Sequence, residues 1–225
     1  MTTHFVNLLE ELRRRAARMA SLVEDMVQEA CESVKDANEA LAGRVIRRDN
    51  DVDSEEVAVE SEVIRLMALY QPVGSDLRLL CAILKINNDL ERIADCTVNV
   101  AERARHMERD TLARRRDTIN EMGVLVRRML RNAIQSFANE DVEMARKVFA
   151  VDELVDALYE QSIKAIVAEG ATSSEGMAAR LDILSVAKNL ERIADHATNI
   201  AEDVIFLSTG EIVRHGDGIP QPNEG

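Results

Sequence analysis

Residues 88–102 read NDLERIADCTVNVAE, and residues 188–202 read KNLERIADHATNIAE. Nine of these fifteen positions are identical at a spacing of 100 residues, and the hexapeptide LERIAD is unbroken in both segments. Earlier in each half the register is looser and the spacing is 103 residues, so that Asp49 aligns with Asp152. The chain is therefore an internal duplication, and we expect two copies of one structural unit.

Apolar residues recur at three- and four-residue intervals through both halves, which is the pattern of amphipathic helices. Cap and turn residues separate these stretches, for example Pro72-Val73-Gly74 in the first half. The pattern predicts six long helices, over residues 3–36, 39–70, 77–107, 112–138, 140–169 and 174–208. Because short connections force neighbouring helices to be antiparallel, we predict an all-α fold of two tandem pseudo-symmetric antiparallel three-helix bundles.

The duplication also sets the predicted domain boundaries. The first three-helix repeat is expected over residues 1–109 and the second over residues 110–208. Residues 209–225 contain two prolines, and three glycines follow Gly210, so we expect a mobile C-terminal tail there.

The composition favours an acidic globular protein over a nucleic-acid-binding or membrane protein. Of the 225 residues, 41 are Asp or Glu and 28 are Lys or Arg, and none is Trp. Nucleic acid selects for basic surfaces and aromatic platforms, so we expect no nucleic acid partner. No apolar stretch approaches the roughly 18 residues of a membrane span, and the start of the chain lacks the pattern of a signal peptide. Three cysteines without a CxxC pair favour a reducing compartment, which predicts a cytoplasmic protein with no direct membrane insertion.

An acidic stripe runs along each LERIAD helix, on a side separate from its apolar face. Since each helical residue advances by about 100°, the stripe residues of one motif fall within about 80° of one another. The stripes comprise Glu91, Asp95, Asn99 and Glu102 in the first half, and Glu191, Asp195, Asn199 and Glu202 in the second. The preceding helices add Asp49, Asp53, Glu56 and Glu60 in the first half, and Asp152 and Asp156 in the second.

Like charges four residues apart destabilise a helix by about 0.2–0.5 kcal/mol per pair, so these stripes require a compensating partner. Carboxylate and amide oxygens without His or Cys suit hard cations, which predicts a divalent metal: Mg²⁺, Mn²⁺, Ca²⁺ or oxygen-ligated iron. The alternative is a solvated face whose acids pair with arginines such as Arg92 and Arg192. Core packing explains why the Leu, Ile and Ala of LERIAD occur in both copies, but it does not explain the Glu, Arg and Asp.

The sequence resembles the PhoU family of phosphate-signalling proteins over nearly its whole length. The resemblance rests on the two three-helix repeats, the two LERIAD motifs, Asp-x-x-Val-Asp at 49–53 and 152–156, QPVGSDLR at 71–78 and GEIVRH at 210–215. It implies a cytoplasmic, homodimeric regulator of phosphate homeostasis without enzymatic activity, held at the inner face of the membrane through its partners. Those partners would be the ATPase subunit of the phosphate transporter and the phosphate sensor histidine kinase. Linking the two would repress phosphate uptake and the phosphate-starvation response.

The paired acids of this family are associated with metal clusters on the bundle surface. By resemblance, the ligands expected here are Asp49, Asp53, Glu91 and Asp95 in the first half, and Asp152, Asp156, Glu191 and Asp195 in the second. Additional candidates on the same stripes are Asn99, Glu102, Asn199 and Glu202. The second half departs from the pattern, because Tyr159 and Ile163 stand where the first half has Glu56 and Glu60. We therefore expect the second site to bind metal less tightly than the first, or not at all.

Three functions are compatible with these residues. The first is the metal-binding adaptor just described, which binds metal without turnover. The second is a carboxylate-bridged di-metal oxidase or hydrolase, although a ferritin-like site needs Glu-x-x-His and none of the four His residues completes one. The third is a metal-free scaffold whose acids dock a basic partner. Cys96 and His196 occupy equivalent positions about 140° from their motif acid, so we interpret them as packing or surface residues rather than ligands.

Overall fold

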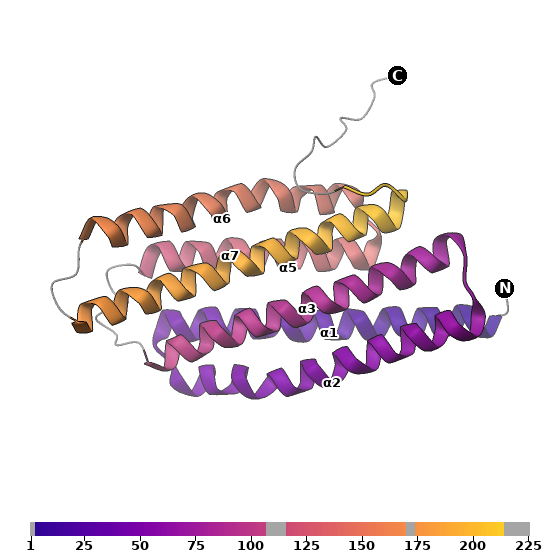
Figure 1. The fold of residues 1–225 in the computed structure, drawn as a ribbon, viewed down its shortest axis with the longest axis horizontal. Helices are drawn as coiled ribbons and strands as arrows, with labels where there is room; N and C mark the ends of the chain where they lie inside the picture. Colours follow the sequence, from indigo (N-terminus) through magenta and orange to yellow (C-terminus); the bar gives the residue numbers. More distant parts are fainter. Residues whose placement is uncertain (1–2, 107–115, 170–173, 214–225) are drawn as a thin grey trace, which may run out of the picture.

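The protein is a bundle of long antiparallel helices (Figure 1). The computed structural model describes residues 3–106, 116–169 and 174–213. Its helices are α1 (Thr3–Asp36), α2 (Glu39–Tyr70), α3 (Gly74–His106), α5 (Arg116–Asn139), α6 (Val142–Glu169) and α7 (Ser174–Thr209). The predicted all-α fold is confirmed, and the predicted helix ends agree within three residues where they are described. The predicted boundary at 109/110, the helix start at 112 and most of the predicted tail lie outside the described residues.

The first turn of each repeat has the same geometry, which explains where the helices stop and restart. Ala37 and Glu140, which are 103 positions apart, both adopt the left-handed backbone conformation, with φ of 48° and 52°. The next residue caps the following helix. The side-chain oxygen of Asn38 accepts the backbone N–H three residues on at 3.1 Å, and that of Asp141 does so at 3.0 Å. Since a helix start leaves four N–H groups unpaired, each cap stabilises its helix.

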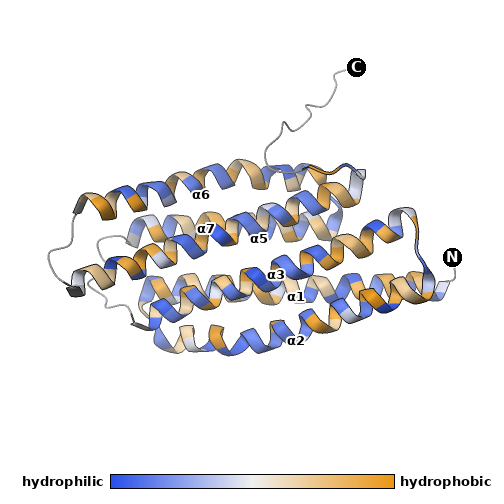
Figure 2. Ribbon diagram, viewed as in Figure 1, coloured by the Kyte–Doolittle hydropathy of each residue, from blue (hydrophilic) through white to orange (hydrophobic). Residues whose placement is uncertain are grey.

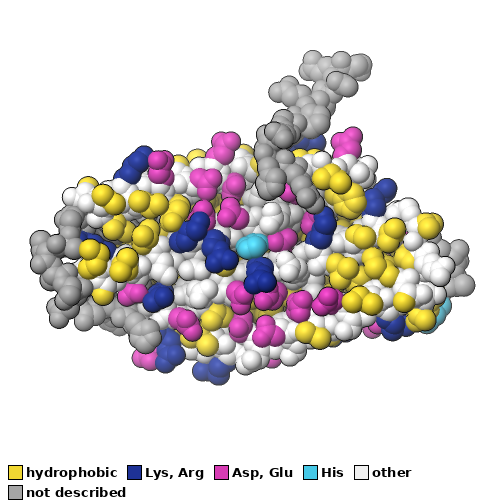
Figure 3. All heavy atoms as spheres, viewed as in Figure 1, with side chains coloured by type: hydrophobic (Ala, Val, Ile, Leu, Met, Phe, Trp, Pro, Cys, Tyr) yellow, Lys and Arg dark blue, Asp and Glu magenta, His cyan; other side chains and the backbone are white. Residues whose placement is uncertain are grey.

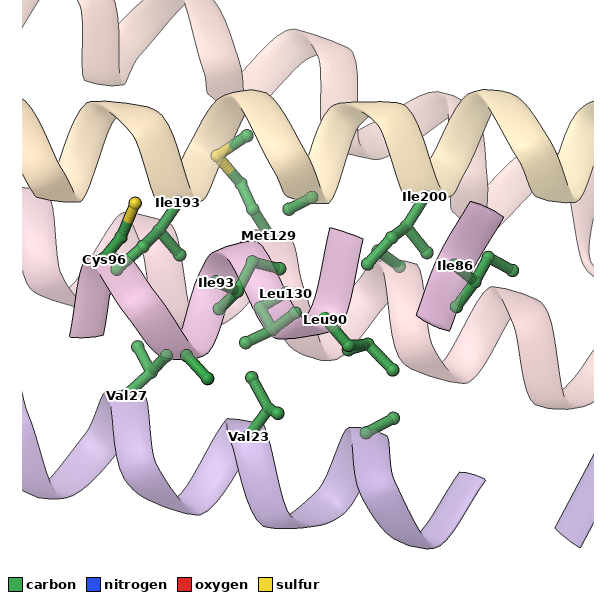
Figure 4. Packing of buried hydrophobic residues seen from close by; sticks show 14 of the residues in the cluster. Val23, Val27, Ile86, Leu90, Ile93, Cys96, Met129, Leu130, Ile193 and Ile200 are labelled. Atoms are coloured by element: carbon green, nitrogen blue, oxygen red, sulfur yellow. The ribbon is translucent and has the colours of Figure 1, made fainter. Parts of the chain in front are cut away.

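Four helices form the centre of the molecule, where the two repeats meet. α1 packs against α5 and α3 against α7, whereas α2 and α6 lie outside, each against its own repeat (Figure 1). Figure 4 shows Val23 and Val27 of α1 facing α3, from which Leu90 and Ile93 project into the same core. The Leu, Ile and Ala of LERIAD are buried in both copies, as their helical positions predict. One continuous core therefore runs through both repeats.

Polar and apolar residues alternate along every helix, so that each helix has an apolar side for the core and a polar side for solvent (Figure 2). None of the helices in the described ranges combines the length and the apolar character needed to cross a membrane. The polar sides of α2, α3, α6 and α7 carry the acidic stripes. Because α2 lies against α3 and α6 against α7, the stripes of each pair of helices lie close together.

Candidate functional site

The acids of α2 and α3 form one group, called here the first acidic cluster: Asp49, Asp53, Glu56, Glu60, Glu91 and Asp95. Partial burial raises the pKa of Glu91, and the charge of Asp95 and, across the helix boundary, those of Glu56 and Asp53 raise it further. Burial likewise raises the pKa of Asp49, with contributions from Asp53 and Asp95. The structure thus brings the acids of the two helices within electrostatic reach of one another, and their charges repel.

The arginine of the first LERIAD motif neutralises only part of this cluster. Arg92 Nε lies 3.3 Å from Glu91 Oε2, and Arg92 Nη1 lies 3.5 Å from Asp95 Oδ2. Ion pairs as exposed as these contribute about 0–1 kcal/mol. Within the described residues no Lys or Arg forms an ion pair with Asp49, Asp53, Glu56 or Glu60. Pairing with arginine therefore accounts for two of the six acids and leaves most of the repulsion in place.

The acids of α6 and α7 form the second acidic cluster: Asp152, Asp156, Glu191 and Asp195. Burial raises the pKa of Asp152 to about 6, with contributions from the charges of Asp156 and Asp195. Burial also raises the pKa of Asp195, followed by the charges of Glu191 and Asp156. One oxygen of Asp152, Oδ1, is buried without a hydrogen-bond partner. The hydroxyl of Thr198 lies close enough to Asp152 to lower its pKa somewhat, and it donates to the carbonyl of Ala194 at 3.1 Å.

The second cluster contains a cation that the sequence analysis did not single out. Lys188 Nζ donates to both carboxylate oxygens of Glu191, at 2.8 and 2.7 Å, and lies 5.2 Å from the centre of the Tyr159 ring. Tyr159 is one of the two residues that replace acids of the first repeat, and Asn88 is the first-repeat equivalent of Lys188. The sequence therefore did contain a signal for this cation: Asn88 of the first repeat is replaced by Lys188, and Glu56 is replaced by Tyr159.

The four additional candidates lie apart from the two clusters. Asn99 and Glu102 are exposed further along α3. Asn199 Nδ2 donates to Asp89 Oδ1 of α3 at 3.2 Å, and Glu202 lines a hollow between α3 and α7. The structure therefore directs Asn199 and Glu202 towards the contact between the repeats rather than towards Asp152 and Asp156 of α6.

A polar group joins the two repeats at the contact of α3 with α7. His196 Nδ1 lies 2.8 Å from Asp89 Oδ1, and Asp89 is 7% exposed. Nearby, Lys85 Nζ donates to Asp203 Oδ1 at 2.6 Å. His196 is thus a packing residue with a carboxylate partner, in agreement with the interpretation made from its helical position. Asp89 was missed because its counterpart in the second repeat is Asn189, so the repeat comparison did not mark it as an acid position.

The donor chemistry of both clusters fits a hard divalent cation, because the side chains offer carboxylate oxygens, and one Arg or Lys balances only part of the negative charge in each cluster. Their present arrangement is more open than a coordination shell. Across residues 3–106, 116–169 and 174–213, no three His, Cys, Asp or Glu side chains are placed so that they could hold a metal ion. Figure 3 shows acidic side chains in separate groups on one face, with Lys, Arg and a His side chain between them. A bound ion would therefore draw the carboxylates of a cluster together.

Comparison with known proteins identifies the family of the chain. The PhoU domain model matches the chain twice, over residues 16–104 and 119–204. The chain belongs to the PhoU family. The two matches correspond to the two three-helix repeats, each with its own acidic cluster, and they confirm the resemblance seen in the sequence.

Relatives within the PhoU family are similar to the chain along nearly its whole length. A protein of Aquifex aeolicus, named "phosphate-specific transport system accessory protein PhoU homolog", is 38% identical over 92% of this chain and 94% of its own length. A Pseudomonas aeruginosa protein with the same name is 36% identical over 92% of this chain and 86% of its own length. These PhoU proteins are named as accessory proteins rather than as enzymes.

Solved PhoU structures share the fold. The crystal structure of PhoU from Pseudomonas aeruginosa matches with a TM-score of 0.85 and 33% identity, over 92% of this chain and 100% of that one. The crystal structure of the phosphate transport system regulatory protein PhoU from Streptococcus pneumoniae matches with a TM-score of 0.86 and 27% identity, over 94% of this chain and 100% of that one. The arrangement of six helices described above is thus that of experimentally determined PhoU proteins.

Proposed function

We propose that this chain regulates phosphate transport as an accessory protein. The observation that carries the proposal is the double match of the PhoU domain, which covers both repeats. It is supported by 38% identity, over 92% of the chain, to a relative named for the phosphate-specific transport system. The two domain matches include the residues of both acidic clusters, so the proposal concerns the whole molecule rather than one repeat.

In detail, the chain acts in the cytoplasm as a homodimer that links the ATPase subunit of the phosphate transporter to the phosphate sensor histidine kinase. When phosphate is abundant, this link represses phosphate uptake and the phosphate-starvation response. Exposed apolar side chains support a role that depends on protein contacts, since such groups mark interaction surfaces when they gather. They occur near the α2–α3 turn, at Leu69, Val73 and Leu77, and near the α6–α7 turn, at Val167 and Met177.

The acidic clusters hold divalent cations, chosen among Mg²⁺, Mn²⁺, Fe²⁺ and Ca²⁺ by their oxygen donors. The ligands are Asp49, Asp53, Glu91 and Asp95 in the first cluster, and Asp152, Asp156, Glu191 and Asp195 in the second. Burial and, after it, the charges of neighbouring acids raise the pKa of Asp49, Glu91 and Asp152, and this supports the proposal because a bound cation would offset both effects. Oδ1 of Asp152, which is buried without a hydrogen-bond partner, is a further oxygen able to coordinate a cation.

Deletion of the gene in the organism that carries it tests the regulatory proposal. With phosphate abundant, we expect the deletion to increase uptake of radiolabelled phosphate and to activate a phosphate-starvation reporter, and we expect the wild-type chain to restore both. Unchanged uptake and an unchanged reporter in the deletion strain would contradict the proposal. Copurification of the tagged chain with the ATPase subunit and the histidine kinase tests the proposed link separately.

Elemental analysis of protein purified without chelator and without a His tag tests the metal proposal. We expect about one ion per chain or more, and loss of that ion in a helical variant carrying Glu91→Gln, Asp95→Asn, Glu191→Gln and Asp195→Asn. If the wild type holds no metal and added Mn²⁺ leaves its melting temperature unchanged, the acids form a metal-free docking face for a basic partner. Turnover of a substrate by the metal-loaded protein would instead favour the di-metal enzyme.

A further inference from the structure

A cavity of about 170 Å³ lies where α1, α3, α5 and α7 meet, away from both acidic clusters. Its inner wall is apolar and is contributed by both repeats, with Val34 of α1, Val100 of α3, and Val186 and Leu190 of α7. All four of these side chains are buried. A cavity of about this size, when lined by apolar side chains, is large enough to admit benzene. The cavity is therefore a space of ligand size at the junction of the repeats.

Gly123 of α5 lines this space where α5 approaches α1 closely. A Cβ atom at position 123 would lie 3.1 Å from Cys31 Sγ of α1, closer than such contacts ordinarily come. Glycine within a helix is less stable than alanine by roughly 0.5–1 kcal/mol, and the close approach of Cys31 explains why a residue without a Cβ stands here. Burial raises the pKa of the Cys31 thiol to about 12, so the sulfur presents an uncharged surface to the cavity.

The mouth of the cavity carries more positive than negative charge, although the chain as a whole has a net charge of −13. Lys35, Arg127 and Glu32 line it, so two cations face one carboxylate. Glu32 accepts a hydrogen bond from Gln28 Nε2 at 2.9 Å, and Arg127 donates to Gln28 Oε1 at 3.1 Å. In the described part of the chain neither Lys35 nor Arg127 forms an ion pair with a carboxylate. Both side chains thus retain N–H groups that can donate hydrogen bonds to a bound anion.

We propose that this cavity binds a small monocarboxylate whose compact apolar body is about the size of a benzene ring. The apolar body lies against Val186 and Leu190, and the carboxylate lies at the mouth between Lys35 and Arg127. A carboxylate accepts charge-assisted hydrogen bonds from both ammonium and guanidinium groups, and it balances the excess positive charge there. Since both repeats line the cavity, the ligand bridges the first repeat and the second.

Fluorine NMR titration of the full chain with 4-fluorobenzoate tests this site. We expect a saturable shift of the ligand signal with the wild type. We expect about tenfold weaker binding of 4-fluorobenzoate by Lys35→Gln and by Arg127→Gln, the effect of losing one charge-assisted hydrogen bond. Neutral fluorobenzene should bind these two variants and the wild type equally. Arg128→Gln is the matched control, because Arg128 is the exposed neighbour on the same helix and does not line the cavity.

Gly123→Leu tests the apolar part of the site, because the larger side chain fills the cavity and should abolish binding of both ligands. Gly123→Ala, which favours the helix, tests the same point with a milder change and should weaken binding of both ligands several-fold. Gly43→Ala is the matched control for a helical glycine, since a Cβ at Gly43 meets only Arg47 Nη1, at 3.5 Å.

Three results would overturn the proposal. The first is the absence of a saturable shift with wild-type protein up to the solubility limit of 4-fluorobenzoate. The second is binding that survives both Gly123→Ala and the mouth variants unchanged, which would place the ligand elsewhere. The third is equally tight binding of fluorobenzene and 4-fluorobenzoate by the wild type, which would show that the mouth does not recognise a carboxylate.

Discussion

The two acidic clusters descend from one duplicated motif, yet they differ in how their charge is balanced. In the first cluster six acids face one another, and Arg92 pairs weakly with two of them. The second cluster has only four acids. There Lys188 Nζ donates to both carboxylate oxygens of Glu191, at 2.8 and 2.7 Å, and lies over the Tyr159 ring. The second repeat thus supplies its own cation, whereas most of the repulsion in the first cluster is not balanced by a basic side chain in the described residues.

An identical motif therefore does not define an equivalent site. LERIAD is the same in both repeats, but its chemistry depends on the facing helix and on the residue two positions before the motif. Asn88 precedes the first motif and Lys188 precedes the second. We therefore expect the two clusters to differ in metal affinity, with the first the tighter of the two.

Metal binding at the first cluster should change more than any other property tested below. Asp53→Asn with Glu91→Gln should lower Mn²⁺ affinity there by roughly 100-fold, because even residues that only support metal ligands change affinity by about 10- to 100-fold when mutated. The equivalent change in the second repeat, Asp156→Asn with Glu191→Gln, should have a smaller effect. Isothermal titration calorimetry with Mn²⁺ on both variants measures this. Equal losses in the two repeats would contradict the asymmetry.

A swap of the balancing residues should make the second cluster resemble the first. Lys188→Asn with Tyr159→Glu removes a cation and adds a carboxylate, so Mn²⁺ affinity at the second cluster should rise by about tenfold. The reciprocal change, Asn88→Lys with Glu56→Tyr, should lower affinity at the first cluster by a similar factor. Electron paramagnetic resonance of bound and free Mn²⁺ measures both. An unchanged second cluster would show that Lys188 and Tyr159 do not set its affinity.

The turns between the first two helices of each repeat should behave alike, in contrast to the clusters. Asn38→Ala and Asp141→Ala each remove a helix cap of the same geometry, so each should lower the free energy of unfolding by about 1 kcal/mol. Guanidinium denaturation of the two variants measures this, with Asn50→Ala on the exposed side of α2 as the control. A cost confined to one repeat would mean that the two caps are not equivalent.

The smallest expected effect concerns pH in metal-free protein. The pKa of Asp152 is raised to about 6 from an ordinary value near 3.8, so its charged form is disfavoured by folding. The contribution of this group to the free energy of unfolding therefore falls as the pH rises from about 4 through about 6. Asp152→Asn should raise stability by about 0.5 kcal/mol at pH 8, after solvent screening. The gain should shrink towards pH 4, as melting curves in chelator would show.

Asp49→Asn repeats the pH experiment in the first repeat. The pKa of Asp49 is also raised by burial and by neighbouring acids, so the sign of the effect should be the same. A stabilisation by Asp152→Asn that grows as pH falls would contradict the direction assigned to its pKa.

The helices and the duplication could be predicted from the sequence because they depend on local patterns. Apolar periodicity marks the buried side of each helix, and cap residues such as Asn38 mark the helix starts. The pairing of α2 acids with α3 acids followed from the short connection at Pro72, which makes the two helices antiparallel neighbours. In each case the prediction needed only contacts that lie close in sequence or within one repeat.

The parts of the site that escaped prediction depend on contacts between distant helices. A helical wheel places Asn199 and Glu202 on the stripe of Glu191, but it does not say which neighbouring helix each residue faces. The contact of α3 with α7 decides that Asn199 reaches Asp89, 110 positions away. The cavity at Gly123 is a similar case, since four helices from both repeats line it.

The continuous core shared by α1, α3, α5 and α7 has a consequence for the origin of the molecule. A single repeat alone would expose the apolar sides of its α1 and α3, or of its α5 and α7, to water. Two identical repeats would cover these surfaces by associating around a two-fold axis, as most homo-oligomers do. Joining them in one chain makes that association intramolecular and raises the effective concentration of the partner. In one chain each half can also change alone, and the two halves now differ in Asn88 against Lys188 and in Asp89 against Asn189.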